Sequence, residues 1–356
     1  MASEKVDSLY PVRYVLCWIS MIYYLIMTIV VCPIAIIFTY YVTYPIHMLL
    51  DRKIKLRFSY FLARCLNFHF VTLSYFSGIN VTEYGEDMTK FVDERCLVLP
   101  NHLGLIDHFI FMRGCDQHGA DLVGRWMFVI YNVWKYMPLG LLWGIHGNYF
   151  VNTVPAAQRA RQLKELRDHF DSTYYPNDYR WVCLYPEGSR LYLIKKSNEE
   201  FERKNKLEPL RHCAYPRTGA ALSVLKQLGP NNGQGPPIKY LVDVTLGYEK
   251  GEVLDVQESM MKTMIDEDKR MYSINYEVFE VREEWKNEED LKKFLFERYK
   301  KKDELLDEFY KTGKFPGAPR VVDFPPVFLM VIHQLVLWIV FIIFVKLLSA
   351  ILFTVI

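Results

Sequence analysis

Two long apolar stretches without charged residues lie near the two ends of the chain. Residues 14–50 contain no Asp, Glu, Lys or Arg, and residues 324–345 lack them as well. About 20 consecutive apolar residues cross a bilayer core, and such stretches are rare in soluble domains, so both predict membrane helices rather than core helices. The first stretch is long for one span and short for two, and Pro33 lies near its middle. It therefore fits either one kinked span or a re-entrant hairpin.

The residues between these stretches alternate between strand-like and helix-like patterns. Short aliphatic runs predict buried strands, and segments with an apolar residue every three or four positions predict helices. This alternation predicts an α/β fold. The predicted strands are 97–99, 147–151, 181–184, 239–247 and 273–281; the predicted helices are 56–80, one that follows Asn152 or Thr153 as its cap with Pro155 in its first turn, and 288–310 with Asn287 as its cap.

Basic residues flank both apolar stretches on the side of the middle segment. One group lies within 52–57 and another within 311–320. Lysine and arginine are enriched on the cytosolic side of membrane helices, so the middle segment is expected to face the cytosol. The sequence therefore predicts three parts: a membrane anchor at 1–50, a cytosol-facing domain at 51–323 and a C-terminal transmembrane helix at 324–356.

The total charge and the cysteines exclude other classes. The formal net charge is +2 over 356 residues, which provides no strong field for binding nucleic acid. The seven cysteines have no paired spacing, so we expect reduced thiols and no zinc site.

The first polar segment with catalytic potential follows the predicted strand at 97–99. It reads Asn101-His102-Leu103-Gly104-Leu105-Ile106-Asp107. We expect a helix to begin within it, and one helical turn would bring the Asp107 carboxylate back to one nitrogen of His102. The other nitrogen would then be free to accept a proton, as a general base must. The spacing alone is a weak signal, because a structural histidine would give it too.

The second segment follows the predicted strand at 181–184, where loops of α/β folds meet ligands. It reads Tyr185-Pro186-Glu187-Gly188-Ser189-Arg190. Gly188 permits a sharp turn or a close approach to a ligand, and Arg190 offers a planar fork that suits phosphate. Glu187 is expected either to hold that fork or to bind a hydroxyl. An ordinary turn with a surface ion pair would explain the segment alone.

Together the two segments resemble the glycerolipid acyltransferase family, whose hallmarks are H-x4-D and E-G-[ST]-R. The resemblance covers about residues 80–320. Four further segments are similar to the lysophosphatidylglycerol acyltransferase branch of that family: 146–151, 215–220, 241–248 and 302–313.

This resemblance implies a mixed sheet in the α/β domain and transfer of a fatty acyl group from acyl-CoA to a glycerol hydroxyl of a lysophospholipid. It also implies residence in the endoplasmic reticulum membrane. Lysophosphatidylglycerol and lysophosphatidylethanolamine are the favoured acceptors, followed by lysophosphatidylinositol. No cofactor or metal is implied beyond acyl-CoA as co-substrate, and the partners are the two lipids and the bilayer.

The resemblance also assigns roles to residues. His102 would be the general base and Asp107 its orienting partner. The substrate-binding residues would be Glu187, Gly188, Ser189, Arg190, Asn101 and, as a secondary candidate, Arg217. The sequence does not assign the oxyanion donors, and backbone amides near Gly104 or Gly188 are candidates for them. Cys183 and Cys213 lie in apolar surroundings that raise a thiol pKa, so neither is expected to act as a nucleophile.

Two features keep alternatives open. The second block of the family usually ends in a basic residue, and here Asn152 occupies that position, with Arg159 or Arg161 as substitutes on the following helix. The aromatic segment 122–143 fits either a pair of core helices or a membrane-facing surface or acyl-tunnel wall, because Trp and Tyr favour lipid interfaces. Other functions that fit the sequence are a CoA-independent transacylase, an acyltransferase for glycerol 3-phosphate, and a catalytically silent lipid-binding protein.

Overall fold

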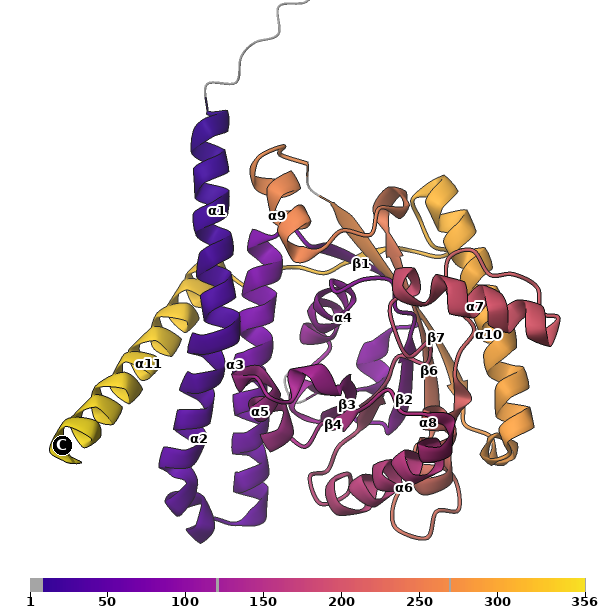
Figure 1. Cartoon of the computed structure of the whole chain (residues 1–356), viewed down its shortest axis with the longest axis horizontal. Helices are drawn as coiled ribbons and strands as arrows, with labels where there is room; N and C mark the ends of the chain where they lie inside the picture. Colours follow the sequence, from indigo (N-terminus) through magenta and orange to yellow (C-terminus); the bar gives the residue numbers. More distant parts are fainter. Residues whose placement is uncertain (1–8, 120–121, 269, 356) are drawn as a thin grey trace, which may run out of the picture.

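A mixed sheet forms the centre of the protein (Figure 1). The computed structural model describes residues 9–119, 122–268 and 270–355, and eight strands of this part pair in the order β4-β3-β5-β2-β6-β7-β1-β8. The strands are β1 (Asn80–Gly85), β2 (Cys96–Pro100), β3 (Trp126–Tyr131), β4 (Tyr149–Val151), β5 (Trp181–Cys183), β6 (Tyr240–Tyr248), β7 (Met271–Glu280) and β8 (Arg320–Val321).

Strand direction divides the sheet into two parts. β2, β3, β4, β5 and β6 run parallel to one another, whereas β7 is antiparallel to β6, β1 is parallel to β7 and β8 is antiparallel to β1. Parallel neighbours end at the same edge of a sheet, so the loops after β2 and β5 are brought together. The prediction of an α/β fold with a mixed sheet is confirmed.

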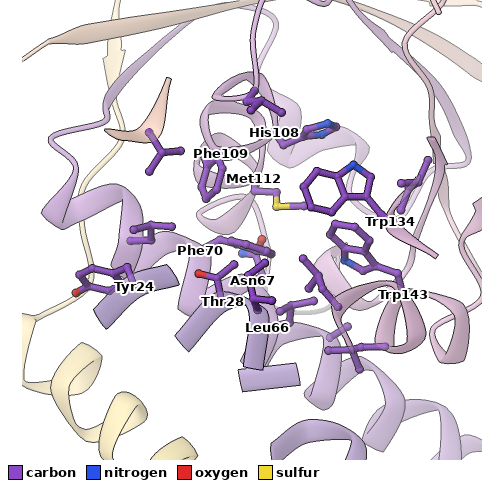
Figure 2. Close-up of a pocket in the computed structure, with 18 of the residues that line it drawn as sticks. Tyr24, Thr28, Leu66, Asn67, Phe70, His108, Phe109, Met112, Trp134 and Trp143 are labelled. Atoms are coloured by element: carbon purple, nitrogen blue, oxygen red, sulfur yellow. The ribbon is translucent and has the colours of Figure 1, made fainter. Parts of the chain in front are cut away.

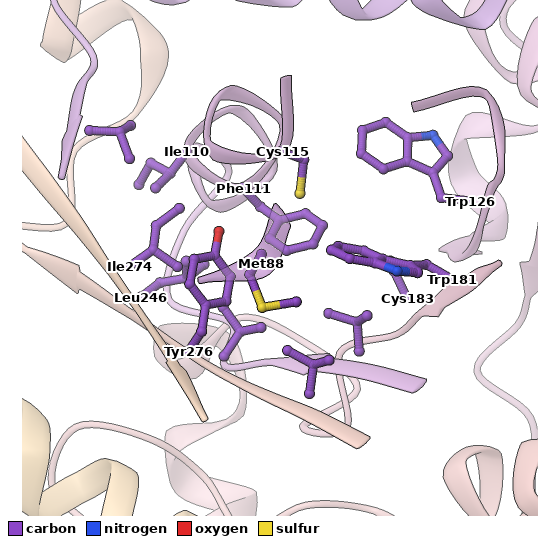
Figure 3. Packing of buried hydrophobic residues seen from close by; sticks show 14 of the residues in the cluster. Met88, Ile110, Phe111, Cys115, Trp126, Trp181, Cys183, Leu246, Ile274 and Tyr276 are labelled. Carbon is purple, nitrogen blue, oxygen red and sulfur yellow. The ribbon is translucent and has the colours of Figure 1, made fainter. Parts of the chain in front are cut away.

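Alternating residues of the central strands fill two separate cores. Val98 of β2 packs in the core beneath helix α4 (Asp107–Asp116), whereas Leu97 and Leu99 pack on the opposite face. Successive side chains of a strand point to opposite faces, which produces this division. Figure 3 shows Phe111 and Cys115 of α4 above the sheet. The opposite face is covered by α6 (Ala156–Thr173), α8 (Thr218–Leu228) and α10 (Glu288–Thr312).

The first apolar stretch is one continuous helix. It comprises α1 (Tyr10–Ile26), a π-helical turn at Met27–Val31 and α2 (Cys32–Leu49). The chain reverses after this helix, at residues 50–51, and not near Pro33, and α3 (Arg52–Phe76) then packs beside α2 (Figure 1). The predicted helix at 56–80 is thus the larger part of α3.

The second apolar stretch forms α11 (Val327–Val355). It and the 40-residue helix Tyr10–Leu49 are the described helices that are long and apolar enough to cross a membrane. They differ in burial: 39% of the most apolar window of the first helix is buried, against 6% for α11. In Figure 1, α1, α2 and α3 lie alongside the sheet domain, whereas α11 slants away from it.

The predicted strands at 97–99, 147–151, 181–184, 239–247 and 273–281 correspond to β2, β4, β5, β6 and β7. Asn287 caps α10, and Gly313 ends it in a left-handed conformation. The predicted cap of α6 is wrong, because Pro155 occupies the N-cap position without a side-chain cap. The remaining helices are α5 (Pro138–Ile145), α7 (Leu191–Asn205), α9 (Val256–Met264) and 3-10 turns at Met88–Phe91, Leu122–Gly124, Asn132–Trp134, Glu249–Gly251 and Glu283–Lys286.

Residues 122–143 do not form a pair of core helices. They contain the strand β3, two 3-10 turns and the first part of α5. The helix-pair interpretation is therefore wrong. β-branched and aromatic residues favour strands. Here the strand β3 is held between β5 on one side and β4 on the other.

Candidate active site

Two loops at the carboxyl ends of β2 and β5 form the candidate site. The strands are parallel neighbours, with Leu97 opposite Val182. The loop after β2 carries His102 and Asp107, and the loop after β5 carries Glu187 and Arg190. The backbone N–H of Leu191 donates to the carbonyl of His102 at 2.9 Å. The sheet thus brings together two segments that lie 85 residues apart in the chain.

His102 and Asp107 form a hydrogen-bonded pair. His102 Nδ1 lies 2.7 Å from Asp107 Oδ2, and the Asp107 side chain is fully buried. The His102 side chain is 14% exposed, and within the described part of the chain its Nε2 makes no hydrogen bond. The arrangement leaves Nε2 free to accept a proton. The pairing does not arise from one turn of helix as expected, because Asp107 is the first residue of α4 and the preceding loop bends back to it.

Other groups fix the Asp107 carboxylate. Oδ2 accepts hydrogen bonds from the backbone N–H groups of Leu103 (2.6 Å) and Gly104 (3.0 Å), and Oδ1 accepts from the Tyr248 hydroxyl (2.5 Å). A carboxylate in the first turn of a helix is also favoured by the helix dipole. These contacts hold Asp107 in one position. The sequence did not indicate Tyr248, although it closes the 241–248 segment that carried the resemblance.

Gly104 has no space for a side chain. A Cβ there would lie 2.7 Å from Val253 Cγ1 and 3.2 Å from the Tyr248 hydroxyl. The absence of a side chain lets the loop approach β6 closely enough for Tyr248 to reach Asp107. The backbone N–H of Gly104 is used by Asp107, and that of Gly188 donates to the Tyr185 carbonyl at 3.0 Å. The N–H groups of these two glycines themselves are therefore engaged.

Glu187 connects three segments of the site. Its side chain is buried, and its two oxygens accept hydrogen bonds from the backbone N–H groups of His102 (2.8 Å) and Ala214 (3.2 Å). Burial raises the pKa of Glu187 to about 8, although these two hydrogen bonds and the charge of Lys302 oppose the rise. Glu187 therefore does not hold the Arg190 guanidinium, and its two oxygens are occupied by backbone N–H groups rather than by a hydroxyl. It fixes the backbone of His102.

Asn101 is also occupied by backbone. Its Oδ1 accepts from the N–H of Leu246 at 2.7 Å, and its Nδ2 donates to the carbonyl of the same residue at 3.2 Å. The Asn101 amide thus continues the pairing of β2 with β6 by one residue beyond Pro100. Its side chain is fully buried and does not face a substrate space.

Arg190 and Arg217 present cations next to a glycine turn. Gly188 has φ +78°, and a Cβ there would lie 3.4 Å from Arg217 Cδ, so the Arg217 side chain covers this turn. Arg190 lies over the Tyr192 ring at 5.2 Å. Among the described residues, neither guanidinium forms an ion pair with a carboxylate. Ser189 lies between Gly188 and Arg190 and is half-buried. Unpaired guanidinium groups at a loop are suited to bind a phosphate.

Lys302 supports the site from behind. It is fully buried on α10, and its Nζ donates to the carbonyls of Leu99 (3.0 Å) and Val244 and pairs with Asp243 at 2.6 Å. This contact joins α10 to β2 and β6 directly below the His102 loop. It was not predicted, because a buried lysine in a sequence is indistinguishable from the exposed lysines beside it.

A large apolar cavity begins next to the dyad. Its volume is about 530 Å³, within the range of small-molecule sites. Leu105 and His108 line the end near His102, and Phe109 and Met112 of α4 project into it (Figure 2). The remaining wall comes from α1 to α3, β3, α5 and α9, including Tyr24, Phe70, Trp126, Trp134, Trp143 and Met260.

The second family block shows no phosphate site. Asn152 is exposed, and its carbonyl accepts a hydrogen bond from Gln162 Nε2 at 3.0 Å. Arg159 is exposed, and Arg161 pairs with Glu165 at 2.9 Å on the surface of α6. Of the two proposed substitutes, Arg161 is therefore already paired, whereas Arg159 has no ion pair within the described part of the chain.

The cysteines near the site are buried thiols. All seven cysteines of the chain are free, and burial raises the pKa values of Cys183 and Cys213 well above the ordinary value. Glu187 raises the pKa of Cys213 further. Neither is a thiolate near neutral pH.

Known proteins match this chain over most of its length. A family model described as "Acyltransferase C-terminus" matches residues 268–338. The Caenorhabditis elegans protein named "Putative 1-acyl-sn-glycerol-3-phosphate acyltransferase acl-12" is 43% identical over 325 residues, covering 88% of this chain and 82% of that protein. Acyl-CoA:lysophosphatidylglycerol acyltransferase 1 of Mus musculus is 29% identical over 68% of each chain. The crystal structure of the acyltransferase PlsC from Thermotoga maritima aligns with a TM-score of 0.45 at 13% identity, covering 83% of this chain and 98% of that chain.

The similarity to the Caenorhabditis elegans protein extends across the catalytic loops and the sheet, since it covers 88% of the chain. The predicted resemblance is thereby confirmed. The chain belongs to the glycerolipid acyltransferase family and is an acyltransferase.

Proposed function

We propose that this protein transfers a fatty acyl group from acyl-CoA to a free glycerol hydroxyl of a lysophospholipid. The observation that carries the proposal is the His102–Asp107 pair with its free Nε2, next to His108, which lines an apolar cavity and whose ring centroid lies 5.8 Å from that of His102. An alcohol is scarcely ionised at neutral pH, so its attack on a thioester needs a positioned base. His102 takes the proton of the hydroxyl, and Asp107 stabilises the imidazolium that forms.

The same histidine completes the reaction. The hydroxyl oxygen forms a bond to the thioester carbon, the carbon–sulfur bond then breaks, and the imidazolium of His102 protonates the leaving thiolate. No acyl-enzyme is needed. The high pKa values of Cys183 and Cys213 agree with a direct transfer. Glu187 and Asn101 act as positioning residues, since both hold backbone of the catalytic loop.

The acceptor phosphate is assigned to Arg190, with Arg217 and the Gly188–Ser189 backbone beside it. Both arginines lack a carboxylate partner in the described part of the chain, so their charges are available to an anion. The names of the mouse and worm relatives support lysophosphatidylglycerol and 1-acylglycerol 3-phosphate as acceptors, respectively. Lysophosphatidylethanolamine and lysophosphatidylinositol share the same phosphate and glycerol.

The apolar cavity is proposed to hold the acyl chain of the thioester. Its lining is predominantly aromatic and aliphatic, and its wall includes α1 and α3 as well as β3.

The 40-residue helix Tyr10–Leu49 is about 60 Å long at 1.5 Å per residue, twice the thickness of a bilayer core, so it is too long to cross the membrane along its whole length without a large tilt. We propose that the protein resides in the endoplasmic reticulum membrane with its catalytic domain facing the cytosol.

The test measures transfer of the labelled oleoyl group from oleoyl-CoA to a panel of lysophospholipids. The membranes contain either the wild-type protein or His102→Ala. His102-dependent transfer would support the proposal and identify the head group. Transfer from a phospholipid donor without acyl-CoA would favour a transacylase. Failure of both donors with every acceptor would contradict catalysis and favour a lipid-binding protein.

A further inference from the structure

The tetrahedral intermediate of this reaction needs a hydrogen-bond donor for its oxyanion. The thioester carbonyl oxygen becomes negatively charged as the acceptor attacks, and a positioned donor stabilises it. The backbone N–H groups of Leu103, Gly104 and Gly188 are already used within the two loops. The N–H of His102 donates to Glu187. These four N–H groups are therefore engaged, and a side-chain N–H that faces the reacting atoms can supply the donor.

Three aromatic rings meet at the inner end of the site. The His102 ring lies 4.4 Å from Tyr185 and 5.8 Å from His108, and the Tyr185 ring lies 4.9 Å from His108, all measured between ring centroids. The Tyr185 hydroxyl lies 3.2 Å from His108 Nδ1. His108 is the second residue of α4, directly after Asp107, so the same helix end positions both side chains.

We assign the tautomer of His108 from its contact with Tyr185, taking the hydroxyl as the donor and Nδ1 as the acceptor. Within the described residues, Nδ1 of His108 is the acceptor available to the Tyr185 hydroxyl proton. A neutral imidazole that accepts at Nδ1 carries its proton at Nε2. No described residue accepts a hydrogen bond from that Nε2–H. His108 lines the apolar cavity, and Figure 2 shows its ring at the end of the cavity above Trp134.

We propose that the Nε2–H of His108 donates a hydrogen bond to the thioester carbonyl oxygen and stabilises the oxyanion. This inference rests on the proposed acyl-CoA-dependent function. A thioester whose chain enters the cavity passes His108, and its carbonyl then lies between His108 and His102. The acceptor hydroxyl attacks with loss of its proton to His102, the oxyanion is held by His108, and its collapse expels the thiolate, which takes the proton from His102. His108 transfers no proton.

The charge state of His108 suits this role. Burial and, to a smaller extent, the neighbouring charges of His102 and Arg190 lower its pKa to about 4, whereas Asp107 opposes them. The ring is therefore neutral near pH 7. A neutral donor does not repel the imidazolium that forms on His102 during the attack, and it does not compete with His102 for the acceptor proton.

The kinetic test compares His108→Phe with His108→Gln. Phenylalanine keeps the ring and removes the donor, whereas glutamine keeps a side-chain N–H. We expect His108→Phe to lower kcat by about 10²- to 10³-fold, the usual effect of one oxyanion donor, with little change in the KM for acyl-CoA. His108→Gln should recover part of the rate, and Tyr185→Phe should lower kcat less, because it only releases the tautomer. A His108→Phe enzyme with wild-type kcat would overturn the inference.

A spectroscopic test does not depend on turnover. Infrared spectra are recorded for carbonyl-labelled oleoyl-CoA bound to the slow variant His102→Ala and to the same variant with His108→Phe. A hydrogen bond lowers the carbonyl stretching frequency, so we expect the band to move to higher frequency when His108 is replaced. An unmoved band would contradict the contact even if both proteins bind acyl-CoA. Absence of His102-dependent transfer in the wild type would overturn the proposed function as well, whereas an active wild type with an active His108→Phe would overturn this inference alone.

Discussion

The two loops of the site differ in how their charges are compensated. In the loop after β2, both oxygens of Asp107 accept hydrogen bonds, and Glu187 fixes the same loop through the backbone N–H of His102. In and beside the loop after β5, Arg190 and Arg217 have no carboxylate partner among the described residues. A general base requires fixed geometry, whereas a phosphate site requires charge that no internal partner neutralises. Charge compensation therefore distinguishes the part of the site that we propose for catalysis from the part that we propose for binding phosphate.

We expect substitution of Asp107 to have the largest effect on activity. Asp107→Asn keeps the shape of the side chain but removes the charge that stabilises the His102 imidazolium. We expect kcat to fall by about 10²- to 10⁴-fold, the range for loss of a positioned base, with acceptor KM nearly unchanged. The measurement is steady-state transfer from oleoyl-CoA. Asp168→Asn, on the surface of α6 and paired with Lys164, is the matched control. Equal rates for both variants would remove Asp107 from the mechanism.

Substitution of Arg190 or Arg217 should change the KM for the acceptor rather than kcat. Arg190→Ala removes one charge-assisted contact to phosphate, which is worth about 1.5–3 kcal/mol and corresponds to about a 10- to 100-fold rise in acceptor KM. The KM for acyl-CoA should change little. Arg217 is exposed, so Arg217→Ala should have a smaller effect of the same kind. Arg161→Ala, already paired with Glu165, is the control. A rise confined to the KM for acyl-CoA would instead assign the arginine to the donor.

Substitution of Tyr248 measures how much the fixed position of the Asp107 carboxylate contributes to kcat. Tyr248→Phe leaves Asp107 Oδ1 without its buried hydroxyl donor. We expect about a 10-fold loss in kcat, corresponding to one hydrogen bond to a charged group. Tyr272→Phe is a suitable control, because that hydroxyl is buried against Ser259 and does not contact Asp107. A kcat equal to the control would show that the remaining donors hold Asp107 sufficiently.

Glu187 gives a smaller effect that depends on pH. Its pKa is about 8 in the folded protein, above the value of 4.5 for an ordinary Glu side chain. The folded state therefore holds the proton more tightly, and the contribution of Glu187 to stability falls as pH rises from about 5 to 8. We expect the thermal midpoint of the wild type to fall over this interval relative to that of Glu187→Gln. Parallel pH profiles for the two proteins would contradict the raised pKa.

The residues proposed as catalytic could be located from the sequence because they form a compact motif after an apolar strand. His102 and Asp107 lie five positions apart, so one short loop joins them and their side chains come within 2.7 Å of each other. The prediction that one helical turn pairs them was nevertheless wrong, since the loop bends back to the first residue of α4. The strands and α10 followed from apolar patterns and from the cap at Asn287.

The roles of Glu187 and Asn101 could not be predicted. Both are polar residues in or beside the family motifs, and the resemblance placed them among the substrate-binding residues. Each uses its side chain on backbone, Glu187 at His102 and Asn101 at Leu246. The aromatic segment 122–143 was ambiguous for a related reason, because aromatic residues suit a buried strand, a helix and a lipid-facing wall alike.

The sequence by itself determined the family, the two apolar helices, the strand pattern and the paired base and carboxylate, because each of these depends on local composition or short spacing. Only the tertiary structure decided which groups support and complete the site. Glu187 reaches the backbone of His102 across 85 positions of sequence, Tyr248 reaches Asp107 across 141, and Tyr185 reaches His108 across 77. Those contacts depend on the order of parallel strands in the sheet and on the packing of α4 above it, which no local pattern specifies.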